Sequence, residues 1–464
     1  MESLPLEINT YHLIVTRQDA SEILLSPCGS GWAIPSVEIH PHHRLAEQLT
    51  QEADRALGVE AYCLLIPELS NRGRDGKAKC AVLESVRQTD NTASGARWFP
   101  GVEVEHHIEA SEAQLVQDAI EELSTYATNK EAGSFARPGW LAELLSWTQE
   151  QLSPLGLRLT GAFHQLNASP TFSLIRLETD GGAVWFKATG EPNSHELHVT
   201  VALAKHFPHY VPQILSVHHR WNGWLSTEVP CISLDRTGDF PAWRRAAEEL
   251  AELQIASIGK TTELLEAVGL RDLRLPNLAE QIGPFLARVS ELMTAQEKLT
   301  PAPLIESEIR SLAEELKQSC ALLESFHLPN TLGHLDFNPG NVLVSEQGCV
   351  FLDWAEGCIT NPLLTFEYLR EHMVRREIEA PAASECLSAA YLRPWASFCS
   401  PEELRRALTL SPIVAVFAYA LASDSWRSPD LVRDPKRSGY FRSLTRRMYR
   451  EAVRTAERSE LCLS

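Results

Sequence analysis

Residues 332–354 read LGHLDFNPGNVLVSEQGCVFLDW, and they are the most informative part of the chain. His334, Asp336 and Asn341 form an H-x-D-x-x-x-x-N pattern, and Asp353 follows at the end of an apolar run. Four polar side chains at this spacing, with the last one leaving a hydrophobic strand, form a more specific signal than any of them alone.

The residues around this pattern predict a β-hairpin. We expect one strand over residues 341–344 and a return strand over residues 349–352, because both runs are apolar. The connecting residues Glu346-Gln347-Gly348 form a turn. Such a hairpin brings Asp353 beside Asn341 at its open end.

The predicted loop carries the groups that phosphoryl transfer requires. That reaction needs a carboxylate near the attacking hydroxyl and oxygen ligands that hold Mg²⁺ on the phosphates. Asp336 fits the first role, and Asn341 with Asp353 fits the second. The alternative is an ordinary surface hairpin, because Asp and Asn are common turn residues. The joint spacing favours the catalytic interpretation.

In this segment the chain resembles the aminoglycoside phosphotransferase and choline kinase family, whose H-x-D-x-x-x-x-N loop and following I/L-D-W segment match here. The resemblance implies an α+β, two-lobed, protein-kinase-like phosphotransferase fold that uses ATP and Mg²⁺ on a hydroxyl of a small molecule. Beyond Asp353 the family has G-D-P-x-x-D-L, whereas residues 360–366 read TNPLLTF and keep only the proline. The sequence therefore does not name the acceptor.

The nucleotide contacts are expected from the preceding strands. Lys187 emerges from an apolar strand and needs a counter-charge, and Glu196 opens the next helical run. In kinase-like folds such a pair positions the ATP phosphates. The alternative is a solvent-facing Lys followed by an unrelated Glu. By analogy with the family, Thr227, Glu228 and Val229 would place backbone groups against adenine.

The N-terminal part has an α/β pattern. Strands are expected over residues 11–16, 22–26, 62–66 and 80–85, with a helix from residue 45 to residue 57 that ends at Gly58. Residues 118–132 are expected to form a second helix that gives way to a polar break at residues 128–134, and a third helix is expected over residues 140–152. The order of strands and first helix resembles a Nudix domain.

The Nudix motif is degenerate where its chemistry would require it. Arg55 and Ala56 stand where the family has its two metal-binding carboxylates, although Glu52 is kept. An arginine there would repel a divalent cation. The sequence therefore predicts a Nudix-like fold without hydrolase activity. His40, His42 and His43 are interpreted as loop histidines rather than as a metal site, because no supporting ligands lie near them in sequence.

Composition sets outer limits on function. The chain has 464 residues and a net charge of −19, which argues against a nucleic-acid partner and is compatible with a cationic acceptor. Ten scattered cysteines, no leader-like start and no apolar run of spanning length predict a cytoplasmic protein without a membrane partner. The apolar run 411–422 is expected to be a short buried helix. Oligomeric state cannot be predicted.

The expected domains are residues 1–134 (Nudix-like), 135–230 (linker helix and small lobe) and 231–464 (helical large lobe). The basic tail, residues 427–458, is expected to dock on acidic surface or to be solvated rather than to bind an anionic partner. Two other functions stay open at this point: a catalytically silent nucleotide sensor that combines both modules, and an active Nudix hydrolase.

Overall fold

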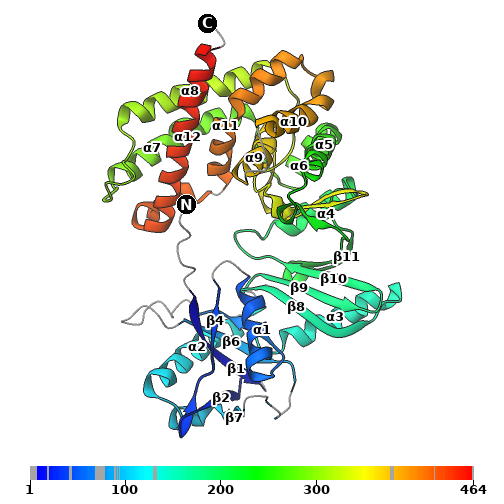
Figure 1. The fold of residues 1–464 in the computed structure, drawn as a ribbon, viewed down its shortest axis with the longest axis vertical. Coiled ribbons are helices and arrows are strands. Elements are labelled where there is room, and N and C mark those ends of the chain that lie inside the picture. The colour runs from blue at the N-terminus through cyan, green and yellow to red at the C-terminus, as the bar shows by residue number, and fades with distance from the viewer. Residues whose placement is uncertain are drawn as a thin grey trace. The chain divides into compact units, whose positions relative to one another are not determined.

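A computed structural model describes residues 8–461 apart from 18–19, 41–43, 68–78, 88–89, 91, 93–94, 129–132, 377–380 and 423. His42 and His43 therefore lie outside the described residues, and His40 is exposed. The chain forms two compact units (Figure 1). Unit one comprises Met1–Leu197 and Gln213–Glu228, and unit two comprises His198–Pro212 and Val229–Ser464. The α+β class is confirmed, and the domain boundary at residue 135 stays a prediction.

The first sheet of unit one is mixed. Its strands and the two helices that belong with it are β1 (Asn9–Arg17), β2 (Glu22–Cys28), β3 (Gly31–Ala33), β4 (Ser36–Ile39), α1 (Leu45–Leu57), β5 (Ala61–Leu65), β6 (Lys79–Ser85), β7 (Arg97–Pro100) and α2 (Ala110–Thr128). The strand order is β3-β2-β1-β6-β5, with β4 paired to β1 and β7 to β2. Only the β1–β6 pairing is parallel among the pairings of this sheet in the described residues.

The predicted helix from residue 45 to residue 57 is confirmed, and it ends because Gly58 adopts a left-handed φ of 67° that closes the last turn. The predicted strands are confirmed as β1, β2, β5 and β6. The second helix was predicted with the wrong start, because α2 begins at Ala110 rather than at residue 118.

The second sheet of unit one is antiparallel. The elements of this part are α3 (Trp140–Leu152), β8 (Leu159–Ala168), β9 (Ser173–Thr179), β10 (Gly182–Ala188), β11 (Ile214–His218) and β12 (Gly223–Thr227). Helix α4 (Glu196–His206) begins in unit one, and from His198 onward it belongs to unit two. The order is β11-β12-β10-β9-β8. Strand β11 begins only at Ile214, some way after α4 ends at His206. Pro208 and Pro212 lie in the intervening stretch and have no N–H to give to a strand partner.

The two sheets of unit one share a hydrophobic core. Trp140 at the start of α3 is fully buried and belongs to one cluster with Ile14 of the first sheet and Phe186 of the second. Gln165 of β8 adds a polar link, because its side-chain amide accepts from the Cys63 N–H at 2.7 Å and donates to the Cys63 carbonyl at 3.0 Å. A side chain here satisfies backbone groups of β5 as a neighbouring strand would.

Unit two is mainly helical, with two small sheets that hold the H-x-D-x-x-x-x-N loop and the segment around Asp353. Its helices are α5 (Phe240–Ser257), α6 (Thr261–Glu266), α7 (Leu275–Thr294), α8 (Glu306–Ser325), α9 (Pro362–Arg375), α10 (Pro381–Leu392), α11 (Pro401–Ala422) and α12 (Pro435–Leu461). One sheet contains β13 (Ile232–Ser233), β16 (Val342–Ser345) and β17 (Gly348–Phe351). The other contains β14 (Arg271–Leu273), β18 (Gly357–Thr360) and β15 (Thr331–His334).

Helix α11 is the most apolar long helix of unit two. By length and composition it could cross a membrane, but 72% of its most apolar window is buried inside the protein. The predicted burial of residues 411–422 is confirmed, whereas the predicted short length is wrong, because the helix begins at Pro401. A buried helix of this kind needs apolar residues on all sides. The nine described cysteines are all free.

Candidate active site

His334 fixes the geometry of the predicted catalytic loop. Its ring is fully buried at the end of β15. Its Nδ1 accepts the Asp336 N–H at 3.2 Å, which leaves the proton on Nε2, and Nε2 donates to the Leu352 carbonyl at 2.9 Å. Burial lowers the pKa of His334, so the ring stays neutral and keeps this tautomer. One side chain therefore ties Asp336 to the segment that leads into Asp353.

The backbone before His334 must be glycine because the surrounding side chains leave no room. A Cβ built on Gly333 would lie 2.6 Å from Cγ2 of Thr360 and 3.2 Å from Oγ1 of Thr365. The same Thr365 hydroxyl accepts the His334 N–H at 2.9 Å. The close approach of β15 to α9 and β18 therefore sets the position of the histidine.

Asp336 and Asn341 lie next to each other in the loop. The Asn341 side-chain nitrogen donates to the Asp336 carbonyl at 3.0 Å and is 3.4 Å from its Oδ2. The amide oxygen of Asn341 therefore points away from Asp336. Asn341 lies in the 3-10 turn Pro339–Asn341. The prediction that it opens the strand is wrong by one residue, because β16 begins at Val342. Asn338 stabilises this turn by accepting the Gly340 N–H at 2.9 Å.

The hairpin brings Asp353 to Asn341 as predicted. In the β16–β17 register Val342 faces Phe351, and one residue further on the Leu352 N–H donates to the Asn341 carbonyl at 2.8 Å. Asp353 follows with a positive φ of 64°, a conformation that side chains rarely adopt. Such backbone strain is typical of positions where a functional side chain must be aimed.

The donor set fits a magnesium ion held together with phosphates. Asn341 offers an amide oxygen and Asp353 a carboxylate, and Mg²⁺ is usually bound by one or two such protein groups with phosphate and water oxygens completing its shell. Within the described ranges, no cluster of three or more His, Cys, Asp or Glu forms a metal cage. The residues therefore suit a metal that arrives with a nucleotide rather than a resident structural metal.

The predicted Lys187–Glu196 pair is present in unit one. Lys187 of β10 and Glu196 at the start of α4 form an ion pair at 2.5 Å, and their side chains are 15% and 2% exposed. The ammonium also lies 5.7 Å from the Trp224 ring centroid. A buried carboxylate that is charged requires such a cation, because burial of an unpaired charge is costly. The pair fixes the lysine amine at the end of an extended strand.

The predicted hinge lies where the two units meet in sequence, since the boundary falls between Glu228 and Val229. The Thr227 N–H donates to the Gln213 carbonyl and the Glu228 N–H to the Ala183 carbonyl. The Arg176 guanidinium binds the Glu228 carboxylate and holds its pKa below the usual range. Thr227 and Glu228 therefore use their N–H groups within unit one. Of the three predicted hinge residues, Val229 is then the one expected to donate its N–H to adenine.

The residues on which the predicted Nudix likeness rests lie in and beside helix α1. Arg55 forms an ion pair with Glu52 at 2.5 Å, so a cationic side chain occupies the surroundings of the one kept carboxylate. Both residues border an open cavity of about 740 Å³ next to α1 and β4. The Nudix likeness and the lack of metal chemistry in this part of the chain both stay predictions.

Sequence reasoning did not identify three titratable side chains whose pKa the Asp336 carboxylate influences. Burial lowers the pKa of His372, and the Asp336 carboxylate opposes that effect. Burial raises the pKa of Tyr368 and of Tyr440, with Asp336 adding to the effect in each case. These residues come from α9 and α12, and no spacing within the sequence relates them to the loop.

A comparison with known protein families matches the part of the chain that contains most of these residues. Residues 189–395 match the phosphotransferase enzyme family. The matched range contains Glu196, the hinge residues 227–229 and the whole catalytic loop with its hairpin, and it begins two residues after Lys187. The match supports a small-molecule phosphotransferase. Sequence comparison with curated proteins gave no match.

Solved structures with similar folds include three small-molecule kinases. An ethanolamine kinase from Plasmodium vivax is 15% identical, with 72% of this chain and 96% of that chain covered and a TM-score of 0.48. A choline kinase from Cryptosporidium parvum is 9% identical, with 68% and 96% covered and a TM-score of 0.46. A spectinomycin phosphotransferase in complex with ADP and spectinomycin is 12% identical, with 67% and 98% covered and a TM-score of 0.40. Likenesses this low carry no argument about substrate.

Proposed function

We propose that the protein is an ATP- and Mg²⁺-dependent phosphotransferase that acts on a hydroxyl of a small molecule. The observation that carries the proposal is the loop in which His334 ties Asp336 to the segment before Asp353, with Asn341 between them. The loop and the hairpin that follows it carry two carboxylates and an amide oxygen. A surface hairpin has no need of a buried histidine that joins its two ends.

Each group in the loop has a role in the proposed reaction. Asp336 accepts the proton of the acceptor hydroxyl while that oxygen bonds to the γ-phosphorus and the bond between the γ-phosphorus and the bridging oxygen breaks, releasing ADP. Asn341 and Asp353 would hold Mg²⁺, which neutralises charge on the phosphates when it is bound. His334 positions Asp336 and does not touch the reacting atoms.

The expected nucleotide contacts complete the proposal. Lys187, held by Glu196, is assigned to the α- and β-phosphates, and Val229 to the adenine edge. The convergence of Lys187 with Asp336 on one nucleotide stays a prediction. The proposal differs from a silent nucleotide sensor because a protein that only binds has no use for Asp336.

An ADP-release assay with a panel of hydroxylated small molecules tests the proposal. Mg·ATP with the correct acceptor should produce ADP and a phosphorylated acceptor in equal amounts, and removal of Mg²⁺ by a chelator should stop both. Nucleotide binding without turnover for any acceptor would instead favour the sensor. Release of nucleoside monophosphate from a dinucleotide, with no requirement for an acceptor, would favour a Nudix hydrolase.

A further inference from the structure

Helix α5 binds the main chain at several points along the segment that carries the proposed catalytic groups. Asp336, Asn341 and Asp353 all lie within residues 332–362. Four polar side chains of α5 form hydrogen bonds to main-chain groups of this segment; they are Arg245, Glu249, Gln254 and Ser257. One helix therefore contacts the segment before, between and after the groups that the proposed reaction uses.

The two contacts at the C-terminal end of α5 hold the two ends of this segment. The Ser257 hydroxyl accepts the Leu332 N–H of β15 at 2.8 Å. The Gln254 side-chain nitrogen donates to the Pro362 carbonyl at 3.0 Å, and its oxygen accepts the Tyr391 hydroxyl at 2.6 Å. Gln254 and Ser257 are fully buried, so water does not compete for these hydrogen bonds.

The other two contacts hold the β16–β17 hairpin next to its turn. The Glu249 carboxylate accepts the Cys349 N–H of β17 at 2.7 Å. The Arg245 guanidinium donates to the Ser345 carbonyl of β16 at 2.5 Å. Glu249 and Arg245 are one helical turn apart and lie on the same face of α5. Each strand of the hairpin is therefore bound to the helix on its own side of the turn.

Glu249 completes the hydrogen bonding of an edge strand. Strand β17 lies at the edge of its three-stranded sheet, so its outward N–H groups need partners from outside the sheet. The Tyr210 carbonyl accepts the Phe351 N–H at 2.8 Å, and Glu249 accepts the Cys349 N–H. A Cβ built on Gly348 would lie 3.1 Å from Oε2 of Glu249, so the carboxylate lies directly against the turn.

Helix α5 is a firm support because its apolar side chains are packed into the core of unit two. Trp243, Ala247 and Leu250 are buried in the main hydrophobic cluster of that unit. Groups that are held by packed helices keep their geometry better than groups held by loops alone. The polar contacts of α5 therefore tie the hairpin to the core.

We propose that α5 positions the catalytic hairpin, and that Glu249 is the positioning residue that sets how Asn341 and Asp353 meet the metal of the Mg·ATP complex. This inference rests on the proposed phosphotransferase. Glu249 acts at the turn, and the pairing of β16 with β17 carries its effect to Asn341 and Asp353 at the open end. Its loss would loosen the pair of metal ligands without removing either of them.

Hydrogen exchange tests the contact without nucleotide or acceptor. In Glu249→Ala the N–H groups of residues 348–353 should exchange about tenfold faster than in the wild type, as expected for the loss of one buried hydrogen bond. Glu249→Gln keeps an oxygen acceptor and should restore slow exchange. Glu252→Ala, the same substitution at an exposed position of α5, should leave exchange unchanged. Wild-type exchange in Glu249→Ala would overturn the inference.

The affinity for ATP with and without Mg²⁺ tests the effect on the metal site, and it needs no acceptor. In calorimetric titrations the wild type should bind ATP more tightly with Mg²⁺ than with a chelator. Glu249→Ala should lower this Mg²⁺-dependent gain about tenfold and leave the affinity in chelator unchanged, because loss of an outer-shell partner weakens a metal site by that order. Glu249→Gln should recover most of the gain.

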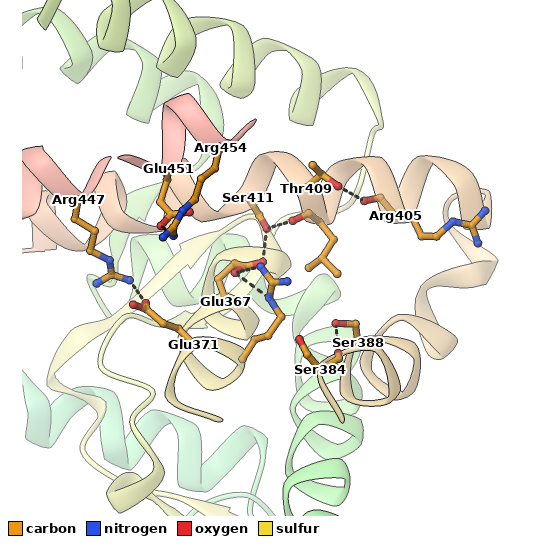
Figure 2. Close-up of polar contacts among 12 residues, drawn as sticks. Glu367, Glu371, Ser384, Ser388, Arg405, Thr409, Ser411, Arg447, Glu451 and Arg454 are labelled. Carbon is orange, nitrogen blue, oxygen red and sulfur yellow. Dashed lines mark hydrogen bonds and ion pairs between the residues drawn. The ribbon is translucent and has the colours of Figure 1, made fainter. Parts of the chain in front are cut away.

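A destabilised variant elsewhere in unit two separates positioning from a general loss of stability. The Ser411 hydroxyl of α11 donates to the Glu367 carboxylate of α9 at 2.8 Å (Figure 2). Ser411→Ala removes this buried hydrogen bond and should lower the melting temperature, as Glu249→Ala does. It should leave the Mg²⁺-dependent gain at the wild-type value. Loss of the gain in both variants would show that lower stability is the cause and would overturn the positioning role.

The two possible failures give different results. A wild-type protein whose affinity for ATP does not increase with Mg²⁺ would contradict the proposed phosphotransferase, and the positioning role would fail with it. A normal gain in the wild type that persists in Glu249→Ala would overturn the positioning role alone and leave the phosphotransferase intact.

Discussion

Replacement of His334 by Phe should detach Asp336 from the segment that leads into Asp353. Phenylalanine keeps a ring of similar size in this fully buried position but makes neither of the two hydrogen bonds of the imidazole. The Leu352 carbonyl and the Asp336 N–H would lose their partners. Each buried group left unpaired costs about 1–3 kcal/mol, so the free energy of unfolding should fall by about 2–6 kcal/mol.

Urea unfolding of the wild type and the variant measures this loss. His209→Phe is a matched control, because His209 is exposed and the substitution is the same. The control should change the free energy of unfolding by about 0.5 kcal/mol or less. Equal stability of wild type and His334→Phe would contradict the claim that the two hydrogen bonds of His334 stabilise the loop.

The pH dependence of the same measurement tests the protonation state of His334. Burial lowers its pKa in the folded state, so the unfolded chain takes up the proton at a higher pH than the folded protein does. The histidine therefore costs stability as the pH falls below its unfolded pKa of about 6.5, by up to about 1.4 kcal/mol per pH unit. The stability difference between wild type and His334→Phe should shrink between about pH 7 and pH 5. A constant difference would contradict a buried neutral ring.

Three further substitutions test other parts of the structure. Asp353→Asn keeps a residue that tolerates a positive φ but removes the carboxylate, so the Mg²⁺ concentration for half-maximal turnover should rise about tenfold; an unchanged Mg²⁺ titration would exclude Asp353 as a ligand. Gly333→Ala should lower the free energy of unfolding, measured by thermal unfolding, by about 1–3 kcal/mol, because neighbouring side chains already occupy the space that the Cβ would take. Gly238→Ala should not lower it, because a Cβ there meets open space. Equal effects of the two substitutions would contradict the packing around Gly333. Lys187→Met removes the cation that pairs with the buried Glu196, so the free energy of unfolding should fall by about 3–5 kcal/mol and ATP binding should weaken. Thermal shift with and without ATP measures both effects. Unchanged stability would show that the pair is not buried as described.

Local patterns in the sequence predicted most of the elements correctly. Helix α1 and its Gly58 cap, helix α3 and the β16–β17 hairpin follow from periodicity and turn residues that lie within a few positions of each other. The approach of Asp353 to Asn341 was also predictable, because a hairpin fixes its own register. The errors lie at element ends, as with the early start of α2.

The parts that could not be predicted depend on contacts between distant residues. The role of His334 depends on the hydrogen bond between its ring and the Leu352 carbonyl, and the H-x-D pattern alone does not predict that contact. The ion pair between Glu371 of α9 and Arg447 of α12 joins residues that lie far apart in the sequence. The basic tail was expected to dock on acidic surface or to be solvated, and the sequence did not indicate that α12 packs against α7, α8 and α11.

The sharpest test of the proposed mechanism is to measure turnover and nucleotide affinity of the Asp336→Asn variant. Once an acceptor is known, kcat of this variant should fall by about 10²–10⁴-fold, which is the contribution typical of a general base. The affinity for Mg·ATP should stay close to that of the wild type, because Asn341 and Asp353 are unchanged. Turnover at the wild-type rate would contradict the catalytic role of the loop.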